Sequence, residues 1–384
     1  MTATEVPARV SAQDPYVGGL DGLRAIAVAA VIVFHFAPTV LPAGFLGVDV
    51  FFVVSGFLIS RLVVREIERS GTVGLGGFWS RRARRLLPAL ATVTVAVLIA
   101  AAVSFSGTEI HDLRAQALGT LFYCANWVMI FAKSNYFTNL GRPSPFLHMW
   151  TLAVEEQFYV VLPLVLLGAR GAVVRHPVRA ALIALAGACA STAWMGVLVS
   201  PTGDPSRAYL GSDSHAMGLL VGVALGIIAG AGKPWDAFTG WMRSNERAIR
   251  VAPWAAAASL VAILVTMRVT RDRTLALYRG GFLVFALLSA VIVAVVATLP
   301  AAPISRFLRM PALVAIGLRS YSLYLWHWPV RVFVTPRPGL HGIGLFSLRL
   351  MISIVLAEIS FRLVERPLRF GLARRGSADR TRGQ

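Results

Sequence analysis

The chain has 384 residues, of which 57% are hydrophobic and 14% charged, and its mean hydropathy is +0.69. Basic residues outnumber acidic ones 37 to 18, giving a net charge of +19. Intrinsic disorder needs low hydrophobicity, a soluble globule would expose too much apolar surface, and a nucleic-acid binder could carry the charge but not the hydropathy. The composition therefore predicts an all-α polytopic membrane protein with its basic residues in loops on one side.

Eleven stretches of the chain are candidates for membrane-spanning helices. Each is largely apolar, and a bilayer core of about 30 Å requires about 20 helical residues. The stretch 115–132 is at the short end of the useful length. In chain order the candidates are 23–40, 44–64, 86–108, 115–132, 147–169, 180–203, 214–232, 251–267, 280–305, 312–335 and 342–364.

The distribution of arginine decides between ten and eleven spans. Cytoplasmic loops carry an excess of Lys and Arg, and the loop 61–85 holds seven arginines against two glutamates. This loop and both chain termini are therefore predicted to be cytoplasmic. The other basic clusters fall on the same side only if 115–132 does not cross. We expect ten transmembrane helices, with 115–132 re-entrant or interfacial. The basic loop 268–279 would lie outside, where lipid or ligand contacts would account for it.

The chain divides into one long apolar region with short polar ends. The N-terminal residues contain no apolar core, so no cleaved signal peptide is predicted and the first hydrophobic helix should direct insertion into the inner (plasma) membrane. Cys124 and Cys189 are far apart in apolar surroundings, and they indicate neither a disulfide framework nor a metal site. The predicted parts are a cytoplasmic segment 1–19, an integral membrane domain 20–370 and a disordered basic cytoplasmic tail 371–384.

Ionisable residues inside apolar stretches are costly and usually functional. His35 follows Arg24 by eleven residues, which on a helix is nearly the same face, about 16 Å further along the axis. The alternative is that both residues are structural, with Arg24 reaching the membrane surface and His35 hydrogen-bonded to a neighbouring helix. The paired spacing, together with other buried charges, favours a functional histidine.

Three carboxylates also lie within predicted spans. Asp49 is near the outer end of the second span, at a depth close to His35, where a carboxylate could fix the tautomer of a histidine. A helix cap or a polar tie between helices is the alternative for Asp49. Glu155 and Glu156 point about 100° apart, so one could face a cavity while the other ties to another helix. Ser55 and Gly56, in the same predicted span as Asp49, are interpreted as permitting close helix packing.

Arg82 and Arg85 form an Arg-x-x-Arg pattern at the predicted cytoplasmic mouth of the third span. Residues three apart share a helical face, which suits two guanidinium groups to contacts with phosphate. A cluster that binds anionic lipid and fixes topology is the alternative interpretation.

Several motifs, in this order, resemble those of the membrane-bound acyltransferase family 3. The resemblance covers nearly the whole chain, and the combination is far more specific than any single motif. The motifs are LDGLRA (20–25) with His35, GVDVFFVVSGF (47–57), RARRLLP (82–88), WTLAVEEQFY (150–159), YSLYLWHWP (321–329) and VERPL (364–368).

The resemblance implies a typically bacterial integral membrane enzyme with about ten helices. It would transfer an acyl group, commonly acetyl, from a coenzyme A thioester to a hydroxyl of a glycan, a lipid-linked sugar or a macrolide. Peptidoglycan and surface polysaccharides are among the family's acceptors. Acyl-CoA would be the co-substrate, with no metal and no nucleic acid. Because the chain ends soon after the last span, we expect a stand-alone member, which favours a small-molecule or lipid-linked acceptor.

The expected site combines these residues into one reaction path. His35 would be the general base, and Asp49, Glu155 or Glu156 would orient it or position the acceptor. Coenzyme phosphates would meet the three arginines. His327, flanked by tryptophans, is interpreted as an interfacial or packing residue. The expected catalytic residues are His35, Asp49, Glu155 and Glu156; the cofactor contacts Arg24, Arg82 and Arg85; and the acceptor contacts His148, Trp150 and Asp213, although helix capping would equally explain Asp213.

A multi-pass transporter or flippase is the principal alternative, since buried charges around a polar cavity are expected there too. The sequence shows no inverted repeat, no matching pair of broken helices and no nucleotide-binding motif. Thioester consumption by the purified protein distinguishes the two classes, because a transporter would not cleave acetyl-CoA.

Overall fold

The computed structural model describes residues 17–105, 107–134, 136–137 and 142–368. Over these ranges the chain is helical, and its only β-contact is an isolated bridge between Arg337 and Leu340. The predicted all-α class is therefore confirmed. The α-helices are α1 (Gly18–Phe36), α2 (Gly47–Ser70), α3 (Leu75–Ser104), α4 (Gly107–Leu121), α5 (Ala125–Phe131), α6 (Trp150–Gly168), α7 (Arg170–Arg175), α8 (Pro177–Leu198), α9 (Ser206–Leu210), α10 (Met217–Gly230), α11 (Gly232–Ser244), α12 (Glu246–Val269), α13 (Phe282–Thr298), α14 (Pro303–Leu308), α15 (Pro311–Leu318), α16 (Ser320–Phe333) and α17 (Gly342–Ser360).

Four short helical turns extend these elements. They are the 3-10 turns η1 (Gly44–Leu46) and η2 (Leu147–Met149) and the π-helical turns η3 (Leu277–Gly281) and η4 (Phe361–Glu365). The two π turns adjoin α13 and α17, so each lengthens a span.

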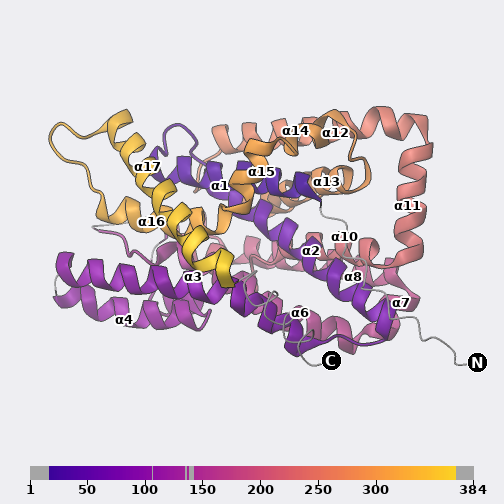
Figure 1. Cartoon of the computed structure of the whole chain (residues 1–384), viewed down its shortest axis with the longest axis horizontal. Helices are drawn as coiled ribbons and strands as arrows, with labels where there is room; N and C mark the ends of the chain where they lie inside the picture. Colours follow the sequence, from indigo (N-terminus) through magenta and orange to yellow (C-terminus); the bar gives the residue numbers. More distant parts are fainter. Residues whose placement is uncertain (1–16, 106, 135, 138–141, 369–384) are drawn as a thin grey trace, which may run out of the picture.

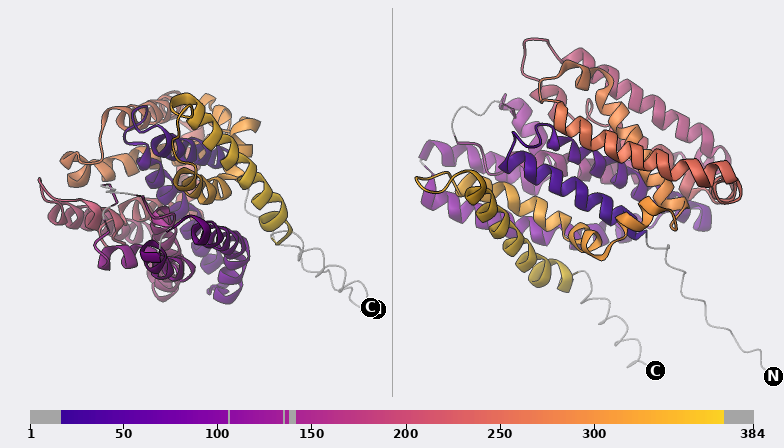
Figure 2. Two further views of the ribbon diagram at one scale, coloured as in Figure 1. Left: turned by 90° about the vertical axis from the view of Figure 1, so that its left-hand side faces the viewer. Right: turned by 90° about the horizontal axis from the view of Figure 1, so that it is seen from above.

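The long helices run roughly along one axis of the molecule and form a bundle (Figure 1; Figure 2). Within the described residues, eight helices are long and apolar enough to cross a membrane. There are nine if α10 and α11, which meet at a bend of 93°, count as one span. The polytopic prediction is thus confirmed. The predicted span 312–335 is not one helix: it is divided at Arg319 into α15 and α16, each too short to qualify alone.

The segment 115–132, predicted not to cross, is also broken in two. α4 ends at Leu121, Tyr123 adopts a positive φ of 53°, and α5 starts at Ala125. Gly119 packs against Ala125 and Val128, so the chain turns back on itself. Neither α4 nor α5 is among the candidate spans. The break lies where a polar side chain of α6 binds the exposed backbone.

That side chain is Gln157, which holds the turn between α4 and α5. Its Nε2 donates to the carbonyl of Tyr123 at 2.8 Å and to Oδ1 of Asn126 at 2.9 Å. Its Oε1 accepts from Ser212 Oγ at 2.6 Å, which links the turn to the loop before α10. A non-helical turn surrounded by apolar helices needs such partners for its polar groups.

Glycines allow α2 and α10 to pack at backbone contact distance. A Cβ on Gly56 would lie 2.1 Å from the carbonyl oxygen of Leu219, and one on Gly222 would lie 2.2 Å from that of Val53. Small residues at helix interfaces are typical of membrane bundles, where close packing replaces the hydrophobic effect as the driving force. The interpretation of Gly56 as a packing residue is confirmed.

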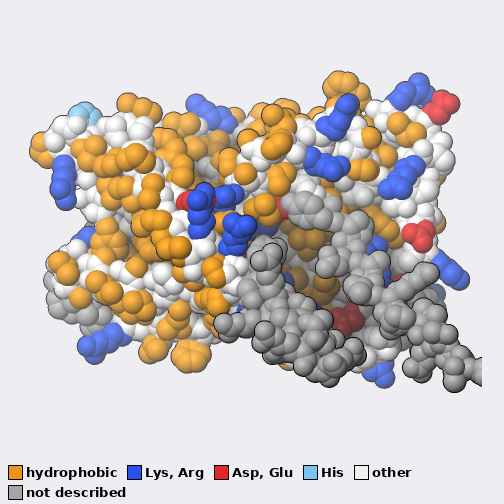
Figure 3. Space-filling view, in the orientation of Figure 1, with side chains coloured by type: hydrophobic (Ala, Val, Ile, Leu, Met, Phe, Trp, Pro, Cys, Tyr) orange, Lys and Arg blue, Asp and Glu red, His pale blue; other side chains and the backbone are white. Residues whose placement is uncertain are grey.

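One end of the bundle carries a cluster of arginines. The end where α2 leads into α3, here called the arginine-rich end, carries Arg65, Arg69, Arg81 and Arg84. The opposite end is where α1 leads into α2. Hydrophobic side chains cover much of the visible surface between the ends, over α3 and α17 (Figure 3). The segment 1–16 and the tail 371–384 lie outside the described residues.

Candidate functional site

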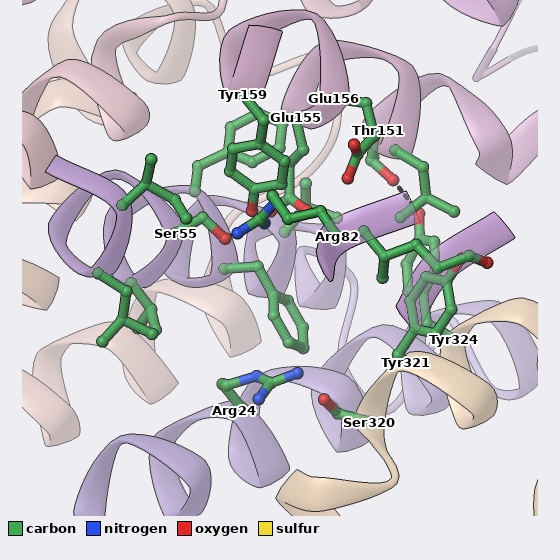
Figure 4. Close-up of a pocket in the computed structure, with 18 of the residues that line it drawn as sticks. Arg24, Ser55, Arg82, Thr151, Glu155, Glu156, Tyr159, Ser320, Tyr321 and Tyr324 are labelled. Atoms are coloured by element: carbon green, nitrogen blue, oxygen red, sulfur yellow. Dashed lines mark hydrogen bonds between the residues drawn. The ribbon is translucent and has the colours of Figure 1, made fainter. Parts of the chain in front are cut away.

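A pocket that is partly open to the surface lies among α1, α2, α3, α6 and α16. Five of the expected site residues line it. These are Arg24, Arg82, Glu155 and Glu156, which are labelled in Figure 4, and Arg85. Three arginines and two glutamates therefore face one cavity, although they come from sequence positions as distant as 24 and 156.

The three arginines are held in different ways. The guanidinium carbon of Arg82 lies 3.5 Å from the centre of the Tyr159 ring, so the planar group stacks on an aromatic face. Arg82 forms no ion pair with a described carboxylate, and its Nε is buried without a hydrogen-bond partner. Arg24 pairs with Asp21 at 2.9 Å. Arg82 is therefore held by aromatic stacking, and Arg24 by an ion pair.

The two glutamates lie on the α6 wall of the pocket. Ser55 of α2 donates to Oε1 of Glu155 at 3.0 Å, which ties the carboxylate to the neighbouring helix. Both Glu155 and Glu156 nevertheless line the cavity. The sequence left open which of the two faces the site, and the structure places both there.

Thr151 and Tyr324 also line the pocket (Figure 4). The Tyr324 hydroxyl shares a hydrogen bond with Thr151 Oγ1 at 2.7 Å and donates to the carbonyl of His148 at 2.9 Å. The Tyr324 ring lies 5.3 Å from the His327 ring. His35 and His327 do not line the pocket. Tyr324 therefore separates the cavity from these histidines.

His35 is buried at the end of α1 and is paired with His327 of α16, with 2.8 Å between His35 Nδ1 and His327 Nε2. His327 Nδ1 lies 2.6 Å from the carbonyl oxygen of Tyr324, which only accepts hydrogen bonds. A neutral His327 must therefore carry its proton on Nδ1 and accept at Nε2. It follows from this bond network that His35 donates through Nδ1, which leaves its Nε2 with a basic lone pair.

A third histidine, His148, packs against this pair. Its ring centre lies 5.7 Å from that of His327, and its Nε2 donates to the carbonyl of Leu325 at 3.1 Å. Its Nδ1 is then the basic nitrogen, and it is buried without a partner among the described residues. The structure thus brings the expected acceptor contact His148 to the expected base. In the described chain, no group of three or more His, Cys, Asp or Glu is arranged to hold a metal ion.

The expectation that a carboxylate orients His35 is wrong for Asp49. Asp49 Oδ1 lies 2.9 Å from Nε2 of His215, and both side chains are fully buried. His215 Nδ1 is 2.7 Å from the carbonyl of Tyr209, so it carries a proton there and the Asp49 contact must contain a second shared proton. Glu155 and Glu156 do not contact His35 either. The partner of His35 is the imidazole of His327.

Trp150 and Asp213, the other expected acceptor contacts, lie away from the pocket lining. Trp150 is buried and stacks on His215, with ring centres 5.5 Å apart. Asp213 pairs with Arg207 at 2.7 Å and accepts from Trp194 Nε1 at 2.8 Å. Partial burial alone would raise the pKa of Asp213, but these bonds lower it to about 2. Asp213 thus secures the loop before α10.

Two residues of the site were missed in the sequence. His327 was interpreted as a packing residue because tryptophans flank it, and Tyr324 was not singled out. The available signal was their spacing, since residues three apart on α16 share a face. That signal does not reveal which helix they meet.

Comparison with known proteins places this geometry in context. Residues 17–359 match the family model of an acyltransferase domain, Acyl_transf_3. The chain is 36% identical over 356 residues to the peptidoglycan O-acetyltransferase OatA of Listeria monocytogenes, covering 92% of this chain and 56% of that protein. It is 36% identical over 360 residues to the putative peptidoglycan O-acetyltransferase YrhL of Bacillus subtilis, covering 92% of this chain and 55% of that one.

A third relative is the O-acetyltransferase OatA of Staphylococcus aureus, 34% identical over 360 residues, with 92% of this chain and 57% of the relative covered. The chain therefore spans just over half the length of the curated relatives it matches. No solved structure matches the chain.

Proposed function

The chain belongs to the acyltransferase 3 family, and from that premise we propose that it is a membrane O-acetyltransferase that uses acetyl-CoA. The observation that carries this proposal is that a buried histidine pair lies next to an arginine-lined pocket, with the side chain of Tyr324 between them. The acyl donor would occupy the pocket, and the acceptor hydroxyl would meet His35 on the other side.

The donor is an anion with a flexible arm, and the pocket offers matching chemistry. Arg82 and Arg85 would bind coenzyme phosphates, for which guanidinium groups are well suited. Arg24 would contribute from the facing helix, with part of its charge compensated by Asp21. Glu155 and Glu156 would accept hydrogen bonds from the amide groups of the pantetheine arm. The thioester would then lie near Thr151 and Tyr324.

Tyr324 closes the pocket toward His35, so transfer would require its ring to turn aside. Its hydrogen bonds to Thr151 of α6 and to His148 of the turn η2 hold it in the closed position described above. Such closure would keep water away from the thioester until the acceptor is bound.

In the chemical step, His35 Nε2 would take the proton of the acceptor hydroxyl as its oxygen attacks the thioester carbonyl. The new C–O ester bond forms and the C–S bond breaks. The coenzyme thiolate leaves and takes the proton from the imidazolium, so His35 returns to its neutral state. His327 would hold the His35 ring throughout through the Nδ1 bond.

The acceptor class follows from the relatives, which are named peptidoglycan O-acetyltransferases. We therefore favour a glycan hydroxyl of that kind over the macrolide considered from the sequence. The arginine-rich end would face the cytoplasm, where acetyl-CoA is found, in agreement with the positive-inside rule.

Release of free thiol by the purified protein tests the proposal. Acetyl-CoA should be consumed in detergent when an amino-sugar oligomer is present, and consumption should fall strongly in Arg82→Ala. Arg84→Ala is the matched control, because Arg84 bonds Ser80 on the same helix and does not line the pocket. A protein that moves glycans but leaves acetyl-CoA intact would be a transporter, and the proposal would be wrong.

A further inference from the structure

Arg331 lies beside His35 and does not line the pocket. It is carried by α16, one turn after His327, and its Nε donates to the main-chain carbonyl of His35 at 2.8 Å. Its guanidinium carbon is 4.9 Å from the centre of the Trp328 ring. The terminal nitrogens of Arg331 make no hydrogen bond within the described residues, and they are not sealed off from the surroundings. One edge of the guanidinium is therefore fixed and the other is available.

A second arginine stands next to the first. Arg349 of α17 is buried, and it donates to the carbonyls of Val334 at 2.9 Å and Arg331 at 3.3 Å. Its guanidinium carbon lies 5.9 Å from the centre of the Phe36 ring, adjacent in sequence to His35. Two positive groups thus flank the end of α1 that carries the proposed base.

No described carboxylate forms an ion pair with either arginine. The sequence contains no acidic residue between Asp272 and Glu358, a range that includes all of α16. The main-chain carbonyls at the ends of α1 and α16 supply partial negative charge, equivalent to about half a charge per helix end. The two arginines carry two positive charges and the two helix ends together about one negative charge, so the site is positive overall.

We propose that Arg331 and Arg349 form an anion-binding subsite for the acceptor, so that the preferred acceptor carries a carboxylate or phosphate close to the hydroxyl that is acetylated. This inference rests on the proposed function. Arg331 would contact the anionic group directly, and Arg349 would hold Arg331 and add to the positive field. An anionic group bound there would place a neighbouring hydroxyl within reach of the His35 ring, because Arg331 is bonded to the same residue.

An oxyanion at this position could come from the acceptor or from a lipid headgroup, and matched acceptors separate the two. The assay uses full-length protein in neutral detergent, acetyl-CoA, and two oligosaccharides of equal length: a neutral amino-sugar oligomer and the same oligomer with a lactyl carboxylate on one ring. The wild type should prefer the carboxylated acceptor. In Arg331→Ala the ratio of kcat/KM for the charged over the neutral acceptor should fall by about tenfold or more, the usual effect of losing one charge-assisted hydrogen bond.

The ratio separates binding from a structural effect on His35. A merely structural Arg331 would lower turnover of both acceptors equally and leave the ratio unchanged, which would overturn the proposal. Arg331→Lys should recover part of the preference. Arg337→Ala is the control, because Arg337 is exposed in the loop after α16, and its ratio should equal that of the wild type.

Two further outcomes are decisive. Equal turnover of both acceptors by the wild type, with Arg331→Ala differing only when phosphatidylglycerol is added, would assign the site to a lipid headgroup and contradict the acceptor proposal. Absence of acetyl transfer to either acceptor would contradict the proposed function itself. Transfer without preference for charge would contradict the subsite alone.

Discussion

At the scale of single residues, the proposed chemistry depends on where one proton lies. The carbonyl of Tyr324 fixes the proton of His327 on Nδ1, and His327 in turn fixes that of His35. The nitrogen left on His35 with a lone pair is then determined by main-chain geometry on another helix. A base held this way does not depend on a carboxylate, unlike the histidine of a Ser-His-Asp triad.

Removing the partner of His35 should therefore slow the reaction without abolishing binding. In His327→Ala, His35 loses its Nδ1 acceptor and its fixed tautomer, and kcat should fall about tenfold or more, since a hydrogen bond of about 1.5 kcal/mol is lost. His327→Gln, whose amide oxygen can accept the same bond, should recover part of kcat. The measurement is steady-state thiol release at equal amounts of folded protein, with KM for acetyl-CoA unchanged. Equal rates for His327→Ala and wild type would remove His327 from the site.

Many residues of the candidate site could be predicted from the sequence. Charges in apolar helices stand out in a sequence, and Arg24, Arg82, Glu155 and Glu156 meet in one pocket as expected. Pairings between distant helices have no such signal. Asp49 and His35 lie at similar depths, yet Asp49 pairs with His215 and His35 with His327, because the choice depends on which helices are neighbours.

At the scale of elements, polar clamps and glycine contacts hold the site together. Gln157, one residue after the paired glutamates, bonds both sides of the break between α4 and α5. The same break places Tyr123 in the wall of the pocket. The shape of the pocket therefore depends on a turn that sequence patterns locate only as an interrupted apolar stretch.

Gln157→Leu should destabilise this region. It removes the bonds that Gln157 makes to the Tyr123 carbonyl, to Oδ1 of Asn126 and to the Ser212 hydroxyl, at a cost of about 1–3 kcal/mol for each group that finds no substitute. The bonds from Asn126 Nδ2 to Ser212 Oγ and to the Leu210 carbonyl remain. The apparent melting temperature in detergent should drop by several degrees. Val161→Leu on the same helix changes an exposed side chain and serves as the control. A Gln157→Leu protein as stable as this control would show that the clamp contributes nothing.

The contact between α2 and α10 gives a second expectation at this scale. A Cβ at Gly222 would overlap the carbonyl of Val53, so Gly222→Ala must push the helices apart, and overpacking of this kind costs about 1–3 kcal/mol. Gly76→Ala in α3 meets nothing within 4 Å and should leave the melting temperature unchanged or slightly higher. If the two variants had the same melting temperature, the close contact between α2 and α10 would not be a source of stability.

At the scale of the whole molecule, the asymmetry of charge should orient the protein. Seven arginines precede or begin α3, and the positive-inside rule places that end in the cytoplasm. The proposed donor pocket opens among the arginines of this half, while Arg331 and Arg349 lie toward the other end. Donor and acceptor would then approach the histidines from opposite sides.

Cysteine labelling tests this orientation. In a background with Cys124 and Cys189 replaced by serine, Val40→Cys lies between α1 and α2 and Thr72→Cys lies between α2 and α3, both at exposed positions. A membrane-impermeant thiol reagent added to intact cells should label Val40→Cys and not Thr72→Cys. Labelling of Thr72→Cys alone would invert the orientation.

Candidate spans could be counted from the sequence because bilayer thickness fixes the length of a membrane-spanning helix. Where the structure departs from that count, contacts between helices accompany the difference. The stretch 312–335 contains enough apolar residues for a span, but the chain bends at Arg319, whose guanidinium pairs with Glu358 of α17 at 2.5 Å. The break between α15 and α16 therefore coincides with an ion pair to another helix, which length and hydropathy alone do not reveal.

The most direct test of the proposed mechanism follows an isotopic acetyl group from donor to acceptor. Wild-type protein and His35→Ala, matched for folded protein, are incubated with carbon-13 acetyl-CoA and a glycan acceptor, and the product is identified by mass spectrometry. We predict a labelled O-acetyl ester with the wild type and a rate lower by about 100-fold or more for His35→Ala, as expected for loss of a general base. Equal labelling of the acceptor by His35→Ala would contradict the assignment of His35 as the base.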